Sequence, residues 1–242
     1  MKVLLVGSEG FLGGWVKKLL LEDNEHELIE IRGKNDLDIT NIKKLNQFFI
    51  NHKPQAVINC AAFVGGISYG YKFPGKMLYE NSKMALNLYQ ISNENNVSIL
   101  VNPISNCAYP GHLDTYKEDN FFAGPPHDSV YNYGMSKRMC VDLGSSFFKE
   151  YSFSSANIIL SNMYGPKDHF DIERSHALGA LVKKISDAKM NNENSVEIWG
   201  TGKPIREWLY VQDGANALVK SLNLNSGHHF FNVGVKKGIS II

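Results

Sequence analysis

A glycine-rich turn near the start of the chain constrains the fold more than any other feature. The apolar run at residues 3–6 leads into residues 7–13, where every third residue is glycine, and a helical pattern with an apolar face follows it. Glycine lets the chain turn sharply and lets backbone N–H groups approach a pyrophosphate at a helix start. This pattern predicts the first strand, turn and helix of a dinucleotide-binding domain. The residues expected at the cofactor here are Gly7, Gly10, Phe11, Leu12 and Gly13.

A tyrosine and a lysine further along the chain are spaced for proton transfer. Tyr133 and Lys137 are four residues apart and therefore share a helix face, with Ser105 upstream of them. An ammonium beside a phenol favours the phenolate and lowers the tyrosine pKa from ~10 towards working pH. We predict that Tyr133 is the general acid or base in the interconversion of a carbonyl and an alcohol. Tyr131 lies six residues from Lys137, on a different face.

Strand and helix patterns alternate along the chain. We predict strands at 2–6, 27–31, 56–59, 98–102, 155–160, 196–199 and 230–233, and helices at 11–21, 42–52, 75–95, 129–151, 175–189 and 212–222. Such alternation predicts an α/β fold, a doubly wound parallel sheet of the Rossmann type. We expect residues 1–165 to form the dinucleotide-binding domain. Residues 166–242 are expected to form a small, partial substrate-binding region with elements that return to the sheet.

The composition limits the partners of the chain. Its net charge is +1, from 25 basic and 24 acidic residues, and no charge run stands out, which argues against nucleic acid and anionic membranes. No apolar stretch is long enough to span a bilayer. The three cysteines, Cys60, Cys107 and Cys140, lack metal-ligand spacing, so we expect no metal and a reducing, cytoplasmic location.

Six short motifs are typical of one enzyme superfamily. They are Ala-Ala-Phe-Val-Gly-Gly-Ile at 61–67, Ser-Asn-Cys-Ala-Tyr-Pro at 105–110, Tyr-Gly-Met-Ser-Lys at 133–137, Asn-Met-Tyr-Gly-Pro at 162–166, Ser-His-Ala-Leu at 175–178 and Trp-Gly-Thr-Gly-Lys-Pro-Ile-Arg-Glu at 199–207. With them the chain resembles the extended short-chain dehydrogenase/reductases (the NAD-dependent epimerase/dehydratase family), and among these the GDP-L-fucose synthase family. The motifs at 61–67 and 105–110 are the discriminating ones.

The resemblance implies a two-stage reaction on a GDP-4-keto-6-deoxy sugar. The C4 ketone acidifies the hydrogens on C3 and C5. Cys107 and His176 would be the acid–base pair that inverts these centres, since thiol and imidazole both titrate near neutral pH. Hydride would then reduce C4 while Tyr133 gives the proton, Ser105 holds the developing oxyanion, and Lys137 also binds the nicotinamide ribose. The product would be a GDP-L-fucose-like sugar nucleotide.

The resemblance also implies further binding residues. Tryptophan and arginine in a glycine-rich loop suit sugar stacking and a bidentate contact with a diphosphate. Lys184 falls where the family has a basic residue facing the nucleotide. The expected substrate-binding residues are Val64, Gly65, Gly66, Ser105, Asn106, Lys184, Trp199 and Arg206. The expected cofactor-binding residues beyond the turn are Arg32, Asp38, Ala61, Ala62, Lys137 and Asn162.

The sequence favours NADP (NADPH) over NAD as the cofactor. Arg32 and Lys34 follow the second predicted strand, where basic side chains suit the 2′-phosphate of NADP, and the fucose synthases use NADPH. Glu9 opposes this choice because the family often has an arginine at its place in the turn. Asp38 is interpreted as a helix cap or as a residue on the adenine side.

The end of the chain leaves alternatives open. The family continues well beyond residue 234, and Ser240 resembles the cap of a next helix, so we expect a fragment or a shortened product. The alternatives to the epimerase/reductase are another nucleotide-sugar 4-epimerase or 4-reductase of the superfamily, and a non-catalytic dinucleotide-binding subunit. As in the family, we expect a homodimer formed through the helix of Tyr133 and the long helix at 75–95.

Overall fold

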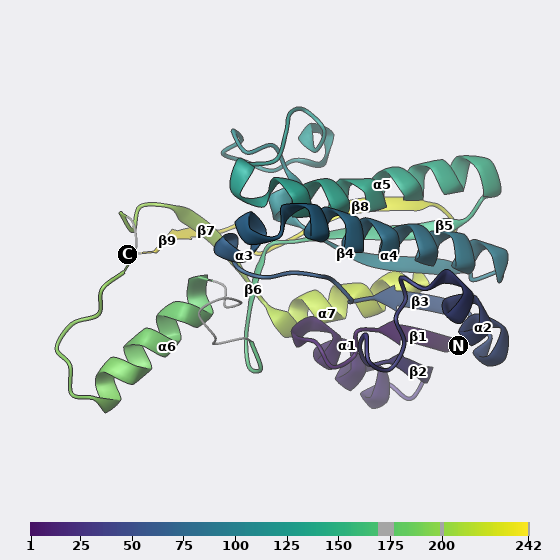
Figure 1. Ribbon diagram of the computed structural model, residues 1–242, viewed down its shortest axis with the longest axis horizontal. Helices are drawn as coiled ribbons and strands as arrows, with labels where there is room; N and C mark the ends of the chain where they lie inside the picture. The colour runs from purple at the N-terminus through teal and green to yellow at the C-terminus, as the bar shows by residue number, and fades with distance from the viewer. Residues whose placement is uncertain (169–176, 199–200, 242) are drawn as a thin grey trace.

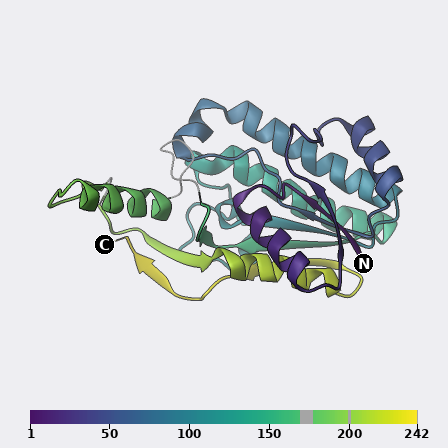
Figure 2. The same cartoon turned by 90° about the horizontal axis from the view of Figure 1, so that it is seen from below.

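A six-stranded parallel sheet with helices on both faces forms the body of the protein (Figures 1 and 2). The computed structural model describes residues 1–168, 177–198 and 201–241. The strands run in the order β2-β1-β3-β4-β5-β8, and all neighbouring pairs are parallel. Their bounds are β1 (Lys2–Val6), β2 (Glu27–Ile31), β3 (Ala56–Asn59), β4 (Ile99–Ser105), β5 (Ser154–Leu160) and β8 (His228–Val233). The predicted doubly wound α/β fold is confirmed.

Each strand of the sheet buries apolar side chains on both faces. In β1, Val3 and Leu5 pack into one core with α1 (Phe11–Glu22) and α7 (Val211–Lys220). Leu4 and Val6 pack into a second core with α2 (Ile42–His52) and α4 (Pro74–Glu94) on the opposite face. Figure 2 shows these two helix layers with the sheet between them. Such runs of apolar residues are what a parallel sheet covered on both sides requires.

The helices follow the strands in regular alternation. Their bounds are α1 (Phe11–Glu22), α2 (Ile42–His52), α3 (Ile67–Lys72), α4 (Pro74–Glu94), α5 (Tyr131–Tyr151), α6 (Ala177–Met190) and α7 (Val211–Lys220). In both views α6 stands apart from the layered body (Figures 1 and 2). Among the described residues, no helix combines the length and the apolar character that crossing a membrane requires.

The strand order determines where a ligand can bind. Strands β2 and β3 lie on opposite sides of β1, so the chain changes direction across the sheet at this point. In open α/β sheets, ligands bind outside the carboxyl ends of the strands at such a switch point. Here that place lies between the turn at residues 7–13, after β1, and the segment at residues 60–66, after β3.

A small second sheet follows the main one. It consists of β6 (Asn162–Tyr164), β7 (Ile205–Tyr210) and β9 (Gly238–Ser240), in the order β6-β7-β9. One expectation was wrong here, because residues 196–198 form no strand. Ser240 ends β9 and pairs with Ile205 in the antiparallel ladder of β7 and β9. Strand β7 was not expected, because it forms by pairing with β6 and β9, which are distant from it in the sequence.

A row of buried asparagines crosses the middle of the main sheet. Asn59 Nδ2 donates to Asn102 Oδ1 and Asn102 Nδ2 donates to Asn157 Oδ1, both at 3.3 Å. These residues belong to the adjacent strands β3, β4 and β5. The hydroxyl of Tyr89, on α4, accepts from Asn157 Nδ2 at 3.2 Å and donates to the Cys140 carbonyl of α5 at 2.9 Å. The row therefore joins the three strands to the two long helices.

Candidate active site

The glycine turn after β1 has a geometry that only glycine permits. Gly7 has a φ of +81°, and a Cβ on Gly13 would stand 2.0 Å from the Gly7 carbonyl oxygen. Helix α1 therefore begins in direct backbone contact with the turn. Gly10 is its N-cap, no side chain caps it, and its first turn holds no acidic residue. The first N–H groups of α1 are left for an anionic ligand, which fits the pyrophosphate of a dinucleotide.

The end of β2 presents a paired carboxylate beside this turn. Ser8 Oγ donates to Glu30 Oε2 at 2.6 Å, and Lys17 Nζ lies 2.9 Å from the same oxygen. Burial acts to raise the pKa of Glu30, but the hydrogen bonds from Ser8 and Lys17 lower it below its ordinary value. Glu30 is therefore ionised and neutralised by Lys17. This pairing limits its repulsion of a phosphate near Arg32, which is exposed just after β2.

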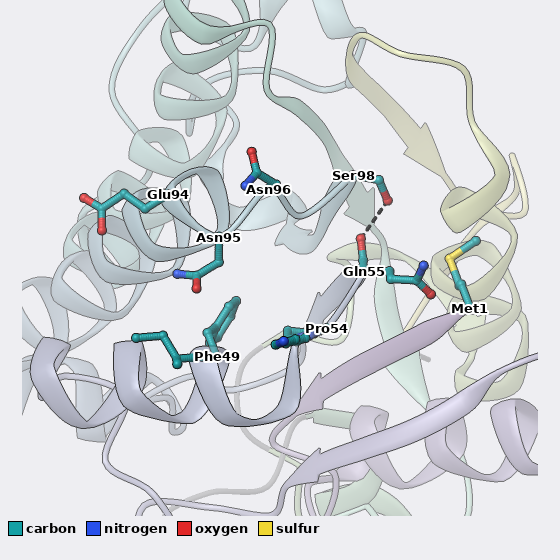
Figure 3. Close-up of a pocket in the computed structure, with 10 residues that line it drawn as sticks. Met1, Phe49, Pro54, Gln55, Glu94, Asn95, Asn96 and Ser98 are labelled. Atoms are coloured by element: carbon teal, nitrogen blue, oxygen red, sulfur yellow. Dashed lines mark hydrogen bonds between the residues drawn. The ribbon is translucent and has the colours of Figure 1, made fainter.

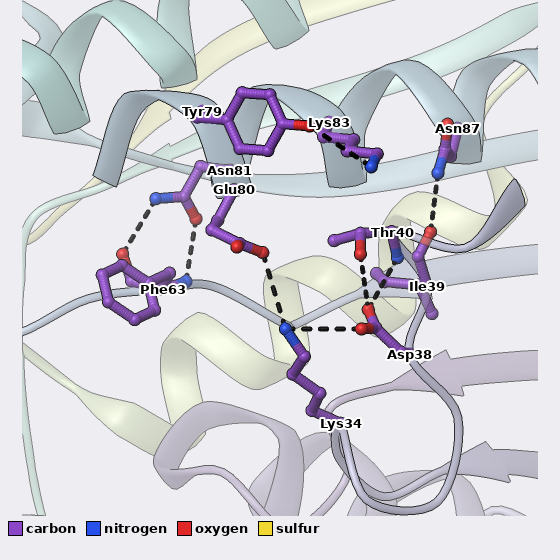
Figure 4. A network of polar contacts seen from close by, with 10 residues as sticks. All are labelled: Lys34, Asp38, Ile39, Thr40, Phe63, Tyr79, Glu80, Asn81, Lys83 and Asn87. Atoms are coloured by element: carbon purple, nitrogen blue, oxygen red, sulfur yellow. Dashed lines mark hydrogen bonds and ion pairs between the residues drawn. The ribbon is translucent and has the colours of Figure 1, made fainter. Parts of the chain in front are cut away.

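The loop after β2 differs from one expectation (Figure 4). Asp38 accepts from the backbone N–H and the hydroxyl of Thr40, at 3.0 and 2.7 Å, so it closes a local turn. The cap of α2 is Asn41, whose side chain accepts from Lys44 N, so the interpretation of Asp38 as a helix cap was wrong. Lys34 Nζ lies 3.3 Å from Asp38 and 3.7 Å from Glu80 of α4. Arg32 is thus the basic residue of this loop better placed for a phosphate.

The segment after β3 is held from two sides. Ala61 N donates to Asn59 Oδ1 at 3.2 Å. Asn81 of α4 accepts from Phe63 N and donates to Phe63 O, both at 2.8 Å (Figure 4). This clamp presents the next residues at the carboxyl end of the sheet, where Val64 is 42% exposed. The predicted binding residues of this segment are Ala61, Ala62, Val64, Gly65 and Gly66.

Lys137 lies at the centre of the remaining predicted site residues. It is 6% exposed, and its Nζ donates to the Pro103 carbonyl of β4 at 2.9 Å. The Nζ atom lies 5.6 Å from the centroid of the Tyr133 ring, one helical turn earlier on α5. Ser105 ends β4, two residues after Pro103, and its Oγ accepts from Cys107 N at 3.4 Å. The structure therefore brings Ser105, Cys107, Tyr133 and Lys137 together.

The protonation of these groups differs from the sequence-based expectation. Burial raises the pKa of Tyr133, although the nearby charge of Lys137 acts to lower it. Burial likewise raises the pKa of the Cys107 thiol to about 11, against the lowering influence of Ser105 and Lys137. The expectations that both groups titrate near working pH were therefore wrong for the protein alone. Both rest in the protonated form, because removal from water disfavours an anion more than one lysine favours it.

Arg138 supports the site and was missed in the sequence. It is 7% exposed on α5, and its Nε donates to the Ala108 carbonyl at 2.7 Å. Ala108 ends the 3₁₀ turn η1 (Asn106–Ala108), which carries the expected residues Asn106 and Cys107. The guanidinium also lies over the Phe121 ring, 5.5 Å from its centroid. An arginine directly after the lysine of the Tyr-x-x-x-Lys motif was the available signal.

The residues predicted to bind ligands in the second half of the chain lie on several different elements. Asn162, on β6, donates to the Glu207 carbonyl of β7 at 3.2 Å, and Arg206 is exposed on β7. Lys184, on α6, donates to the Glu197 carbonyl at 3.1 Å. His176 and Trp199 lie outside the described residues.

A hollow on another part of the molecule lies away from this site (Figure 3). Its volume is about 620 Å³, and Met1, Phe49, Gln55, Asn95 and Ser98 are among its lining residues. Met1 and Ser98 directly precede β1 and β4, so the hollow is at the amino ends of the strands. Its lining includes none of the predicted site residues. The predicted catalytic residues Ser105, Cys107, Tyr133 and Lys137 lie together elsewhere, towards the carboxyl end of β4.

The glycine turn and the Ser-Tyr-Lys arrangement on a doubly wound sheet agree with the comparison to known families. A model described as the NAD dependent epimerase/dehydratase family matches residues 3–234. The chain belongs to this family. A GDP-L-fucose synthase of Sinorhizobium fredii (strain NBRC 101917 / NGR234) is 31% identical over 242 residues, which are 100% of this chain and 76% of that protein.

Two further relatives extend the comparison. GDP-L-colitose synthase of Yersinia pseudotuberculosis is 34% identical over 227 residues, which are 92% of this chain and 72% of that protein. The crystal structure of a GDP-L-fucose synthetase from Naegleria fowleri bound to NADP superposes with a TM-score of 0.86 at 26% identity. That match covers 98% of this chain and 77% of the other. The family member described here therefore shares its architecture with a nucleotide-sugar enzyme.

Replacing Gly13 by alanine is expected to weaken NADPH binding by about tenfold or more, equivalent to about 1.4 kcal/mol. The added Cβ would displace the start of α1, because it would stand 2.0 Å from the Gly7 oxygen. The matched control is Gly14→Ala, whose Cβ would lie 3.8 Å from its nearest neighbour, Ser8 O. Fluorescence titration with NADPH and thermal unfolding check both variants. Equal affinities for the two variants would show that the close approach is not needed.

The thiol of Cys107 is expected to react slowly at neutral pH. Its pKa of about 11 means that the thiolate fraction, and hence the rate of alkylation by iodoacetamide, rises about tenfold per pH unit between about pH 7 and 9. Mass spectrometry of the Cys107 peptide measures this rate. Lys137→Met should slow alkylation further, because it removes a charge that favours the thiolate. A plateau below about pH 8.5, the ordinary thiol pKa, is incompatible with this expectation.

Proposed function

We propose that the protein is a nucleotide-sugar epimerase/reductase that acts on a GDP-4-keto-6-deoxy sugar. It would epimerise C3 and C5 and then reduce C4, giving a GDP-L-fucose-like product. The observation that carries the proposal is that Cys107, a proton-transfer group, shares a tight turn with Ser105 next to the Tyr133–Lys137 pair. A plain reductase would not need this thiol. The names of the relatives, GDP-L-fucose synthase and GDP-L-colitose synthase, support the substrate class.

The cofactor of the proposed reaction is NADPH. When bound, it supplies the hydride for C4. The uncapped start of α1 fits the pyrophosphate, and Arg32 is the proposed partner of the 2′-phosphate. The NADP-bound relative supports this choice. Glu9 is exposed and lies outside the Ser8–Glu30–Lys17 contact, and this position is compatible with a phosphate near Arg32.

The reductive step needs a proton donor and a means to stabilise negative charge. Tyr133 is protonated at rest, so it can give its phenolic proton to the oxygen on C4. The ammonium of Lys137 then stabilises the phenolate that remains. The Ser105 hydroxyl, whose oxygen accepts from Cys107 N, keeps its own hydrogen for the developing oxyanion. Its place at the end of β4 fixes the direction of that hydrogen bond.

The epimerisation needs a group that gives and takes protons at carbon. We propose His176 as one member of this pair, on the basis of its Ser-His-Ala-Leu motif: it would take the carbon-bound proton whose loss forms the enolate. Cys107 rests as a thiol and can give its proton to the opposite face of that enolate. The thiolate formed in this way is a strong base in its buried position and can take a proton back. The order in which the two act on C3 and C5 follows from how the sugar is bound.

The two parts of the chain have separate proposed roles. Residues 1–165 would bind the cofactor and carry Ser105, Tyr133 and Lys137. Residues 166–242 would bind the nucleotide sugar through Lys184, Trp199 and Arg206. Strand β8 and helix α7 of this second part belong to the main sheet and its covering layer, which supports the expectation that elements return to the sheet.

We also propose a cytoplasmic homodimer. Leu78, Tyr79 and Leu86 are apolar or aromatic residues on α4 that are 37%, 60% and 46% exposed. Large apolar side chains grouped on one helix are typical of a contact surface. Helices α4 and α5 pack side by side and offer a common outer face (Figure 1). The near-zero net charge of +1 fits neither a nucleic-acid partner nor an anionic membrane.

The reaction separates into two measurable halves. Incubated with GDP-4-keto-6-deoxy-mannose in D2O, the protein should incorporate deuterium without cofactor and should reduce the sugar once NADPH is added. Tyr133→Phe should lower the rate of reduction by about 10²- to 10⁴-fold and leave the incorporation of deuterium in place, because it removes only the acid for C4. Mass spectrometry of the sugar nucleotide follows both halves.

The neighbouring tyrosine provides a matched control for this experiment. Tyr131 is 40% exposed and belongs to another helix face, so Tyr131→Phe should keep both half-reactions. Reduction without deuterium incorporation would make the protein a plain 4-keto reductase. Absence of both half-reactions would favour a non-catalytic dinucleotide-binding subunit.

Light scattering is expected to give about twice the chain mass of 27.1 kDa. Leu86→Glu should shift the mass towards the monomer, since a charge in a buried contact is strongly unfavourable. Leu21→Glu changes a residue of α1 that is 56% exposed and should leave the mass unchanged. A monomeric unsubstituted protein would reject the dimer.

A further inference from the structure

A tyrosine outside the predicted site stacks on a close sequence neighbour of Cys107. Tyr116 lies in the long connection between β4 and α5. Its ring stacks on the ring of Tyr109, with the centroids 4.5 Å apart and the planes at 1° to each other. Tyr109 is 1% exposed and follows Cys107 by two residues. Tyr116 itself is 42% exposed. One face of its ring is therefore covered by a buried neighbour of the site, and the rest is open to a ligand.

The backbone of Tyr116 is attached to the main sheet. Asn232 Nδ2 donates to the Tyr116 carbonyl at 3.2 Å, and Asn232 N donates to Glu118 Oε1 at 2.7 Å. Asn232 Oδ1 also accepts from the Tyr109 hydroxyl at 3.0 Å. Asn232 belongs to β8, one residue before its carboxyl end. The exposed ring is thus fixed at the end of the sheet where the proposed reaction takes place.

The end of β8 that holds Tyr116 also leads to a contact with β7, the strand of Arg206. Two residues after Asn232, Gly234 packs so closely on the Glu207 carboxylate that a Cβ would stand 2.5 Å from Oε1. Glu207 neighbours Arg206 on β7. Burial raises the pKa of Tyr116, while the charge of Arg206 lowers it and Cys107 raises it. The phenol therefore stays protonated and can donate a hydrogen bond.

We infer that Tyr116 is a specificity-determining residue whose phenol contacts the sugar of the nucleotide-sugar substrate. This inference rests on the proposed function, in which Cys107 faces the sugar carbons and Arg206 faces the diphosphate. Tyr116 is stacked on Tyr109, two residues after Cys107, and would therefore meet the sugar on the side of these carbons. A tyrosine ring offers an apolar face to the C–H groups of a sugar and a hydroxyl to its oxygens. A sugar whose substituents differ on the side that faces Tyr116 would lose this contact.

Tyr116→Phe tests the contact because it keeps the stack on Tyr109 and removes only the hydroxyl. Binding of GDP-mannose and of GDP is measured by calorimetry. The Kd for GDP-mannose should rise about three- to tenfold, the effect of one hydrogen bond, whereas the Kd for GDP should change less than about twofold. Tyr116→Ala should weaken GDP-mannose binding more, since the ring is lost as well. Tyr151→Phe, at a tyrosine 51% exposed on the far end of α5, is the matched control and should bind both ligands normally.

The outcomes separate this inference from the proposed function. An unchanged Kd for GDP-mannose, or an equal rise for GDP, would overturn the sugar contact and leave the ring as a cover for Tyr109. With the keto sugar as substrate, Tyr116→Phe should raise the KM of the sugar and leave kcat and the KM of NADPH nearly unchanged. If the unsubstituted protein binds GDP-mannose but converts no keto sugar, the proposed function fails and the comparison of Kd values still decides the role of Tyr116. No binding of GDP-mannose together with no conversion of the keto sugar by the unsubstituted protein would overturn both.

Discussion

The hydrogen bonds among Asn59, Asn102 and Asn157 are the constraint on which the site depends. Each amide lies in the centre of a sheet that is otherwise apolar, and each is at most 5% exposed. A shift of one residue between neighbouring strands would turn the amides away from one another and leave buried polar groups unpaired, at about 1–3 kcal/mol each. Only one register therefore satisfies them. That register sets where β4 ends, and with it the position of Ser105.

Tyr89 carries this constraint from the sheet to the helices. Its hydroxyl contacts the asparagine row and the backbone of α5 at Cys140, one turn beyond Lys137. Lys137 in turn donates to Pro103, on the same strand as Asn102. Helix α5 is thus bound directly to β4 through Lys137, and it is joined to the asparagine row through Tyr89 of α4. This arrangement explains how Lys137 can be only 6% exposed next to the phenol of Tyr133 and the thiol of Cys107.

The sequence was most informative where a pattern has a local cause. The strands β1, β2 and β3 and helix α2 have the predicted bounds, because apolar runs and a capping asparagine act over a few residues. Gly13 was also predictable, since the close approach of α1 to the turn leaves no room for a side chain. The protonation of Cys107 was not, because it depends on burial by elements distant in sequence. Strand β7 and the contact of Arg138 with Ala108 were missed for the same reason.

The hydrogen bonds between Asn81 and Phe63 link helix α4 to the segment after β3. Asn81 lies on the same helix as Leu78 and Leu86, yet it is 7% exposed and points inward to the backbone of the segment that precedes Val64. A single side chain therefore ties this segment to the position of α4. In the proposed dimer joined through α4, the same side chain would link the subunit contact to the loop at Val64.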